Sequence, residues 1–428
     1  MRMPGYTFLL FFVVTGLVLA LINRHAYHWI TRSFAPSPRV RRLIVFVLVS
    51  SMGGMVLGRL FDLMWKEAPV KWLLFYAGTV QLGVLMSVGL LLPIDLARLV
   101  IRGVERLRAG REPAAAGVVD ATDAPVATPV VADAPSLNAE ALPRRAFLAQ
   151  AAAGSAFLIG GSSSLYGALV ERHDYEVEDV PVRIPGLSRE LDGFTIVQLS
   201  DVHIGHFVAE PELAAAEELV RRAKPDLIVL TGDLLDHDPA LAHRLGTFAR
   251  RLGPLAREGV AAISGNHDFY AGIRPFEQAL EGAGATLLRN RGRVIGTGNA
   301  RFALLGVDDI WARRRRGGPD LERAIQSLPS VDGSAARSRD LPRILLCHNP
   351  SYFEESAGQI ALQLSGHTHG GQVNLVVNPA EWFVKRGWVR GRYDFKGSQL
   401  YVNRGFGTVG PPARVGSPPE ISRIVLTA

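Results

Sequence analysis

Cysteine is nearly absent from this 428-residue chain, which contains only Cys347. A single cysteine excludes an intramolecular disulfide and any metal site built from clustered thiolates. A metal site in this chain must therefore use histidine and carboxylate ligands. Cys347 follows an apolar run and is expected to be a packed thiol.

Excess positive charge is missing from the C-terminal two thirds of the chain. Residues 146–428 contain 31 basic and 31 acidic side chains, whereas residues 1–145 contain 16 basic and 9 acidic ones. A nucleic-acid-binding domain carries its basic excess on the folded domain, so nucleic acid is not expected as a partner. The excess lies beside apolar runs, which is typical of membrane topology signals.

Three uncharged apolar runs in residues 1–109 predict transmembrane helices at about residues 6–22, 43–61 and 72–92. The second reaches spanning length only if Arg59 extends its charge toward the membrane surface. The runs lack the internal Asp, Glu, Lys and Arg residues that mark an ion path, which argues against a channel or transporter.

A fourth uncharged stretch lies in residues 143–170, after the motif Pro143-Arg144-Arg145-Ala146-Phe147-Leu148. Paired arginines before a mildly apolar segment predict either a twin-arginine export signal or a fourth membrane helix with basic residues on its cytoplasmic side. No clear cleavage site follows it.

Counts of Lys and Arg between these segments predict the orientation of the chain. The segments before, between and after the first three runs contain 1, 5, 3 and 7 basic residues in chain order. Under the positive-inside rule, residues 23–42 and 93–145 are then cytoplasmic and residues after about 170 lie outside. Residues 110–142, rich in Ala, Pro, Val and Asp, are expected to be a flexible linker.

Residues 171–428 change to short β-rich runs that alternate with helical ones, which predicts one α/β domain. Most of the predicted strands are too apolar for half-exposed hairpins, so they indicate sheets covered on both faces. The strands are expected at 195–199, 227–230, 260–263, 302–306, 344–346, 361–364, 400–402 and 421–426, and the helices at 210–223, 241–257 and 275–282.

Polar motifs follow five of these strands. They are Asp201-Val202-His203, Gly232-Asp233, Gly265-Asn266-His267-Asp268, Cys347-His348-Asn349 and Gly366-His367-Thr368-His369. In open α/β sheets the ligand crevice lies at the carboxyl ends of the strands. Mixed nitrogen and oxygen ligands without sulfur suit Mn, Fe, Zn or Co, and a lone Asp between two ions can bridge them. The series therefore predicts a site for two divalent metal ions.

This motif series resembles that of the calcineurin-like metallophosphoesterases, over roughly residues 190–428. The stretch Gly366–Gln372 and the tail from Asn403 to Ile421 are similar to the bacterial membrane-anchored branch of that family. The resemblance implies a two-sheet αββα sandwich, here preceded by a multi-helix transmembrane region. Together with the apolar runs and the basic-residue count, it predicts a multi-pass protein of the bacterial inner (cell) membrane with an extracytoplasmic catalytic domain.

The resemblance also implies the roles of the motif residues. One metal ion would be held by Asp201, His203, Asp233 and His369, and the other by Asp233, Asn266, His348 and His367. His267 would face the phosphate and protonate or stabilise the leaving oxygen, and Asp268 would orient His267 and raise its pKa. A hydroxide between the metals would attack phosphorus in line.

Further basic and polar residues have weaker predicted roles. Arg404 and Arg414 are candidates for phosphate contact, because Gly405 and Gly407 mark a tight loop. The run Arg313–Arg316 is expected to be a solvated loop. His206, Asp236 and His237 are expected at the surface or supporting the site rather than binding metal.

The sequence thus predicts a membrane-anchored phosphoesterase acting on a phosphate monoester or diester, with a lipid or envelope phosphodiester as the candidate suggested by the membrane anchor. One alternative is a pyrophosphate hydrolase of the UDP-2,3-diacylglucosamine type in lipid A synthesis. That reaction requires a cytoplasmic active site, against the predicted orientation. A non-catalytic membrane scaffold is the other alternative, and the completeness of the ligand set argues against it.

Overall fold

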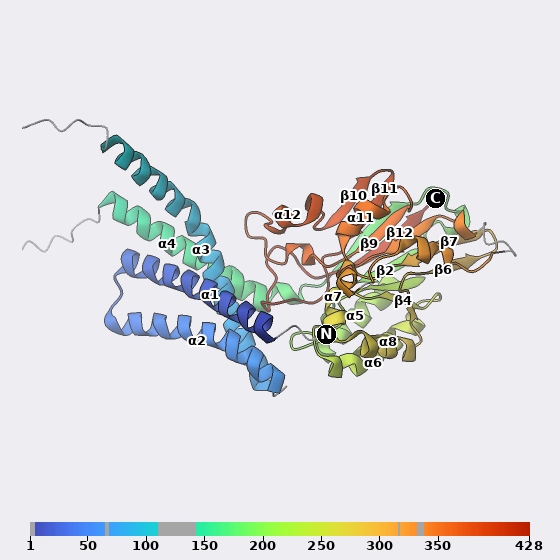
Figure 1. The fold of residues 1–428 in the computed structure, drawn as a ribbon, viewed down its shortest axis with the longest axis horizontal. Helices are drawn as coiled ribbons and strands as arrows, with labels where there is room; N and C mark the ends of the chain where they lie inside the picture. The colour runs from blue at the N-terminus through green and yellow to red at the C-terminus, as the bar shows by residue number, and fades with distance from the viewer. Residues whose placement is uncertain (1–4, 65–67, 110–142, 316, 332–337) are drawn as a thin grey trace, which may run out of the picture. The chain divides into compact units, whose positions relative to one another are not determined.

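The structure is a computed structural model that describes residues 5–64, 68–109, 143–315, 317–331 and 338–428 (Figure 1). The chain divides into two compact units: Met1–Gly53 with Gln81–Ser162, and Gly54–Val80 with Ser163–Ala428. The predicted linker at 110–142 lies outside the described residues.

Long helices form the N-terminal part of the described chain: α1 (Gly5–Phe34), α2 (Pro38–Met64), α3 (Ala68–Ala109) and α4 (Arg144–Leu169). Among the described residues, three helical stretches are long and apolar enough to cross a membrane: Pro38–Gly58, Pro69–Arg108 and Arg144–His173. The first predicted span lies within α1, several of whose side chains are outside the described set. The number and direction of membrane crossings stay predictions.

Polar side chains join three helices inside the first unit. The Asn23 amide donates to Gln81 Oε1 at 2.8 Å, and the Gln81 amide donates to Ser51 Oγ at 2.7 Å. All three residues are buried. Between apolar helices such bonds supply specific contacts that apolar packing alone does not.

Two six-stranded sheets form the centre of the second unit. The first has the order β1-β12-β2-β3-β4-β5 and the second the order β10-β11-β9-β8-β7-β6. The strands of the first sheet are β1 (Glu176–Arg183), β2 (Thr195–Leu199), β3 (Leu227–Thr231), β4 (Val260–Ile263), β5 (Thr286–Leu287) and β12 (Glu420–Thr427). Those of the second are β6 (Arg291–Thr297), β7 (Ala300–Gly306), β8 (Arg343–Leu346), β9 (Leu362–Ser365), β10 (Gly391–Phe395) and β11 (Ser398–Val402).

Alternate residues of the inner strands pack in opposite directions. Ile196 and Val229 of the first sheet share a buried cluster with Leu304 and Leu364 of the second, which fills the space between the sheets. The other faces are covered by helices and loops with separate clusters. The helices of this unit are α5 (Glu210–Ala223), α6 (Ala242–Leu252), α7 (Asn266–Ala271), α8 (Ile273–Gly282), α9 (Leu321–Gln326), α11 (Phe353–Ser356) and α12 (Ala380–Phe383). The predicted two-sheet sandwich with outer helices is confirmed.

The predicted strands are all present, and the four strands that the sequence pattern did not predict are the sheet edges β1, β5, β6 and β10. An edge strand is not buried on both faces, so it can carry charge and proline. β1 reads Glu-Val-Glu-Asp-Val-Pro-Val-Arg and pairs only with β12. Helix α6 ends at Leu252, before Gly253-Pro254, rather than at the predicted Arg257.

Candidate metal centre

The candidate ligands lie in loops that follow parallel strands. β2, β3 and β4 are parallel in the first sheet, and β8 and β9 are parallel in the second. Their carboxyl ends therefore meet at one edge of each sheet. The predicted residues follow as expected: Asp201 and His203 after β2, Asp233 after β3, Asn266 after β4, His348 after β8, and His367 and His369 after β9.

Five of these seven residues have left-handed backbone conformations. Their φ angles are 52° at Asp201, 50° at His203, 52° at Asp233, 73° at His367 and 52° at His369. Residues with a side chain rarely adopt this region, at a cost of about 1–3 kcal/mol each, and such residues cluster at functional sites. The loops are therefore held in strained turns that direct polar side chains to one place.

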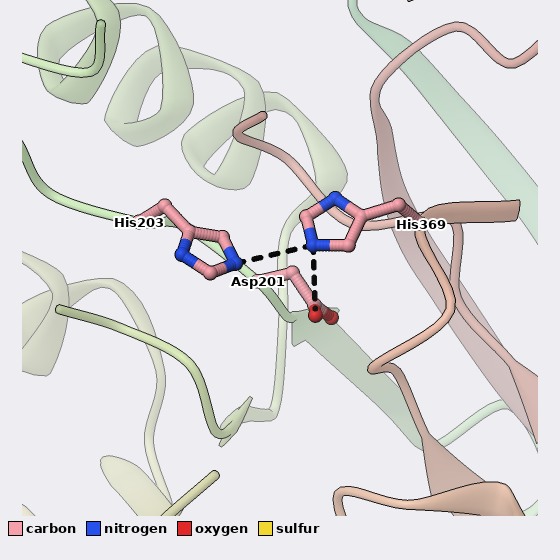
Figure 2. A group of neighbouring side chains, drawn as sticks. All are labelled: Asp201, His203 and His369. Carbon is pink, nitrogen blue, oxygen red and sulfur yellow. Dashed lines mark hydrogen bonds and ion pairs between the residues drawn. The ribbon is translucent and has the colours of Figure 1, made fainter. Parts of the chain in front are cut away.

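The first ligand group brings together the two sheets, because Asp201 and His203 follow β2 and His369 follows β9. His203 Nε2 lies 3.1 Å from His369 Nε2, which lies 3.3 Å from Asp201 Oδ1. Figure 2 shows the two rings and the carboxylate converging. All three side chains are buried, and their ligand atoms lie close enough to hold one metal ion.

The second ligand group consists of Asp233, His348 and His367. His348 Nε2 lies 3.2 Å from Asp233 Oδ2 and 3.2 Å from His367 Nδ1. His348 Nδ1 lies 2.8 Å from the Thr231 carbonyl oxygen. A carbonyl can only accept, so Nδ1 carries a proton and Nε2 is the nitrogen that is placed to bind a metal ion.

Asn266 adds an amide oxygen to the site. The residue is 9% exposed, and among the described residues its buried Oδ1 has no hydrogen-bond partner. A buried acceptor without a partner costs about 1–3 kcal/mol. A coordinated metal ion would remove that cost, so the orphaned oxygen fits the predicted ligand role.

Asp233 stands between the two ligand groups. Its Oδ2 lies 3.2 Å from His348 Nε2 and 3.9 Å from His203 Nε2. Its Oδ1 accepts a hydrogen bond from the backbone N–H of His267 at 2.8 Å. A carboxylate in this position has the geometry of a bridge between two metal ions.

The electrostatics of the site favour bound cations. Burial alone would raise the pKa of Asp233, but the imidazoles of His348 and His203 lower it well below its usual range. Burial and a neighbouring imidazole lower the pKa of His367 and that of His369, so both rings are neutral. Metal binding requires ionised carboxylates and neutral imidazoles of this kind. At His348 burial lowers the pKa, but the carboxylates of Asp233, Asp201 and Asp309 together outweigh burial and raise it, which indicates a negative potential there.

His267 is oriented by Asp236 rather than by Asp268, which corrects the prediction. His267 Nδ1 lies 2.8 Å from the Asp236 carbonyl oxygen and 3.5 Å from Asp236 Oδ1. Asp268 instead caps the loop: it accepts backbone hydrogen bonds from Leu234, Leu235 and Gly265 at 3.0, 2.9 and 2.8 Å. A carboxylate used in this way stabilises the turn and does not face the imidazole.

The surroundings of His267 keep its ring protonated. Burial lowers its pKa, but the carboxylates of Asp236 and Asp233 outweigh burial and raise the pKa to about 9. Asp236 Oδ1 also lies 3.8 Å from His203 Nδ1, so the same carboxylate faces both rings. Because His267 Nδ1 donates to a carbonyl, the second proton lies on Nε2.

Neither predicted substrate arginine is placed to contact a phosphate ester. Arg414 has no exposed surface, and its guanidinium donates to four backbone carbonyls, those of Arg404, Gly405, Gly407 and Ser417. It also lies 3.3 Å from His369 Nδ1. Arg404 forms ion pairs with Glu420 and Glu176, both at 2.7 Å. Both arginines therefore stabilise the loops behind the metal ligands, which corrects the prediction.

Two glycines permit the close packing of the ligand loops. A Cβ atom on Gly265 would collide with the Asp233 carboxylate. One on Gly366 would collide with Ser200 Oγ and Asp201 Oδ2. The glycines in these motifs are therefore required by the ligands of the neighbouring loop.

Sequence reasoning missed one acidic residue of the site, Asp309. It follows β7, whose parallel neighbour β8 leads to His348. Asp309 is 1% exposed, and among the described residues its Oδ2 has no hydrogen-bond partner. Burial raises its pKa, while nearby His348 and His367 lower it. Residues 302–306 were a predicted strand, and the acidic pair Asp308-Asp309 shortly after it could have indicated a further site residue.

Comparisons with known proteins agree with this geometry. A sequence model of the family described as calcineurin-like phosphoesterase matches residues 194–371. The uncharacterized metallophosphoesterase YkuE of Bacillus subtilis is 30% identical over 282 residues, which cover 63% of this chain and 91% of that protein. The chain belongs to the calcineurin-like phosphoesterase family. It is thereby a metal-dependent phosphoric ester hydrolase, and all seven candidate ligands lie inside the matched region.

Two further relatives differ in how they are described. The phosphodiesterase YaeI of Escherichia coli is 33% identical over 240 residues, which cover 54% of this chain and 82% of that protein. A transmembrane protein with metallophosphoesterase domain from Danio rerio is 32% identical over 283 residues, 63% of this chain and 62% of that protein. The calcineurin-like domain thus occurs in relatives named as transmembrane proteins, in line with the apolar helices of this chain.

Proposed function

We propose that this chain is a membrane-anchored phosphoesterase that uses two divalent metal ions. The observation that carries the proposal is the position of Asp233, whose Oδ2 faces imidazoles of both ligand groups. The proposed ligands are Asp201, His203, Asp233 and His369 for one ion and Asp233, Asn266, His348 and His367 for the other. Mn, Fe, Zn or Co suits this donor set.

The residues around the metals have separate tasks in the proposed reaction. Two bound divalent ions would supply Lewis acidity toward the phosphoryl oxygens and a water of lowered pKa. His267 holds a proton on Nε2 and has a ring that is 21% exposed, so it can protonate the leaving oxygen of an ester. Asp236 keeps that ring oriented and charged.

An amphiphilic phosphate ester is the proposed substrate class. Within the second unit, a cavity of about 70 Å³ is lined by Met55 and Leu74, from the membrane-capable helices, together with Phe207 and Asp236. Asp236 contacts His267, so apolar side chains lie near the proposed proton donor. The first carbon atoms of an apolar ester chain would contact these side chains beside the reacting phosphate, which supports a lipid or envelope phosphodiester.

Hydrolysis by the full chain in detergent tests both parts of the proposal. Bis-p-nitrophenyl phosphate and p-nitrophenyl phosphate, with Mn, Zn or Fe added after chelation, separate diester from monoester activity. Metal-restored turnover with about two ions per chain is expected. Turnover that persists after chelation, or one ion per chain at full activity, would contradict the dinuclear site.

The substrate class needs a second comparison. A phosphodiester that carries an acyl chain is expected to have a higher kcat/KM than its short-chain analogue, measured below the critical micelle concentration of both. Equal values would reject the amphiphile while leaving the dinuclear site standing.

A further inference from the structure

A cavity of about 760 Å³ lies in the first unit, where α1, α3 and α4 contribute its lining. The metal centre uses none of its residues. Its lining is rich in cations, and we call it the arginine pocket, defined by Arg32, Arg98, Arg102 and Arg145 with Trp29 and Asp95.

Helical periodicity gathers these side chains. Trp29 and Arg32 are three residues apart on α1, and on α3 Arg98 follows Asp95 by three residues and precedes Arg102 by four. Side chains three and four residues apart lie on one face of a helix. Each helix therefore presents a polar face at this point although most of its surface is apolar.

One carboxylate, that of Asp95, contacts three members of the cluster. Asp95 Oδ2 accepts from Trp29 Nε1 at 2.9 Å and lies 2.9 Å from His25 Nε2. Arg98 Nη1 lies 3.7 Å from Asp95 Oδ1, and its guanidinium stacks 4.5 Å from the centre of the Trp29 ring. Asp95 thus pairs with Arg98 and holds Trp29 in place. Its two oxygens are engaged by Arg98, Trp29 and His25.

The other three arginines lack a counter-charge. Among residues 5–64, 68–109 and the rest of the described chain, no carboxylate forms an ion pair with Arg32, Arg102 or Arg145. The three side chains are exposed, so water screens their charges in part, but together they give the cavity a positive potential that attracts an anion. Arginine forks pair two N–H groups with two oxygens, so phosphate is the anion they fit best.

We propose that the arginine pocket binds the phosphate headgroup of an anionic phospholipid. Exposed apolar side chains stand next to the cations along the same helices: Leu96 is 62% exposed, Leu99 68% and Phe147 57%. Guanidinium groups beside a bare apolar helix surface match an amphiphile whose phosphate and acyl chains bind together. The basic-residue count also predicts a cytoplasmic location for these segments, where anionic lipids are abundant.

The pocket also gives a role to the paired arginines of the sequence motif. Arg144 and Arg145 are both exposed, but only Arg145 lines the cavity. A twin-arginine export signal needs both residues, but a headgroup pocket needs only the second. Arg144 is therefore a matched control, with the same charge change one position away.

Native mass spectrometry of the delipidated full chain in detergent tests the proposal, with phosphatidylglycerol or phosphatidylcholine of identical acyl chains added. We expect phosphatidylglycerol to bind at least about fivefold more tightly. Arg145→Gln and Arg102→Gln should each weaken its binding about fivefold, the effect of removing one cation near an anionic headgroup. Arg144→Gln should leave binding unchanged, and thermal unfolding of each variant shows whether it is folded.

Three results would overturn the proposal. One is equal binding of the two lipids, and another is an equal loss of binding in Arg144→Gln and Arg145→Gln, which would indicate unspecific surface charge. The third is full displacement of the lipid by inorganic phosphate at equal concentration, because the ligand would then be a free phosphate. If Arg145→Gln is not folded, Arg102→Gln decides alone.

Discussion

In the candidate metal centre, Asp201 and Asp233 each lie within 3.3 Å of an imidazole nitrogen, whereas in the arginine pocket one carboxylate stands among four guanidinium groups and pairs with Arg98 alone. The first arrangement concentrates oxygen and nitrogen lone pairs and attracts cations. The second concentrates N–H donors and attracts anions. Two polar clusters in one chain can therefore be assigned opposite ligands from the balance of donors and acceptors alone.

The two clusters also differ in how their backbones hold them. The metal ligands lie on strained turns after strands, five of them with positive φ. The arginines lie on continuous helices, at ordinary helical spacing. Metal coordination needs fixed positions for several atoms, while long, flexible arginine side chains can adjust to a headgroup.

The largest effect is expected from removing Asp233, the carboxylate that both ligand groups share in the candidate metal centre. In Asp233→Asn we expect kcat/KM to fall about 10³-fold, because a neutral amide cannot bridge two cations. Hydrolysis of bis-p-nitrophenyl phosphate and metal content by plasma emission measure the loss. Asp394→Asn, on the exposed edge strand β10, is the control and should keep both. If the Asp233→Asn variant still bound two metal ions per chain, the bridging role proposed for Asp233 would be contradicted.

Arg414 is a buried arginine with a structural role, unlike the arginines of the pocket, which are proposed to bind a ligand. Arg414→Met should lower the free energy of unfolding by about 3 kcal/mol, because four carbonyl oxygens lose their buried donor. Chemical denaturation followed by tryptophan fluorescence measures the change. Arg390→Met, an exposed arginine with one backbone hydrogen bond, should change stability by less than about 0.5 kcal/mol. Similar losses in the two variants would remove the structural role assigned to Arg414.

The carboxylates of Asp236 and Asp233 raise the pKa of His267 to about 9, and removal of His267 tests whether its proton takes part in the reaction. His267→Ala should lower kcat about 10²-fold, the usual contribution of a general acid, with both metals retained. A substrate with a nitrophenolate leaving group needs no proton, so its kcat should fall much less than that of an alkyl ester. His243→Ala, at an exposed histidine, is the control. An equal loss for both leaving groups would argue against proton donation.

The orienting carboxylate gives a smaller effect. Asp236→Asn should reduce kcat/KM about tenfold, as loss of a supporting hydrogen-bond partner does. Asp236 helps to raise the pKa of His267 to about 9, so its replacement lowers that pKa. The protonated ring is then lost at lower pH, and the alkaline limit of the rate profile should move down. A pH profile with an unchanged alkaline limit would leave Asp236 with a structural role only.

In the arginine pocket an Asp→Asn substitution is expected to strengthen ligand binding, whereas in the metal centre it is expected to reduce activity. Asp95→Asn removes the only carboxylate that pairs with Arg98 among the described residues, yet it keeps an acceptor for Trp29. Binding of phosphatidylglycerol should strengthen about fivefold, since one negative charge is removed beside the headgroup. Lipid titration followed by native mass spectrometry checks this. Weaker binding would show that Asp95 holds the pocket open rather than opposing the anion.

The inner strands and the polar motifs that follow them could be predicted because each is encoded locally. Strand β2, for example, is a five-residue apolar run that leads into Asp201 and His203. The edge strands could not be predicted, because β1 and β10 carry charged residues on faces that are not buried. Asp309 was not assigned to the site, and Asp236 was expected at the surface or supporting the site without a stated role, since neither belongs to a motif with a recognisable spacing.

The sequence by itself determined the two-sheet architecture, the order of the ligand motifs and the apolar helices, because burial and turn chemistry act on neighbouring residues. Only the tertiary structure decided which carboxylate faces His267, why Arg414 is buried and where four arginines of three helices meet. Those relations join residues far apart in the chain. Asp236 and Asp268 have the same chemistry and lie close in sequence to the site, so only their packing separates the orienting carboxylate from the one that caps a loop.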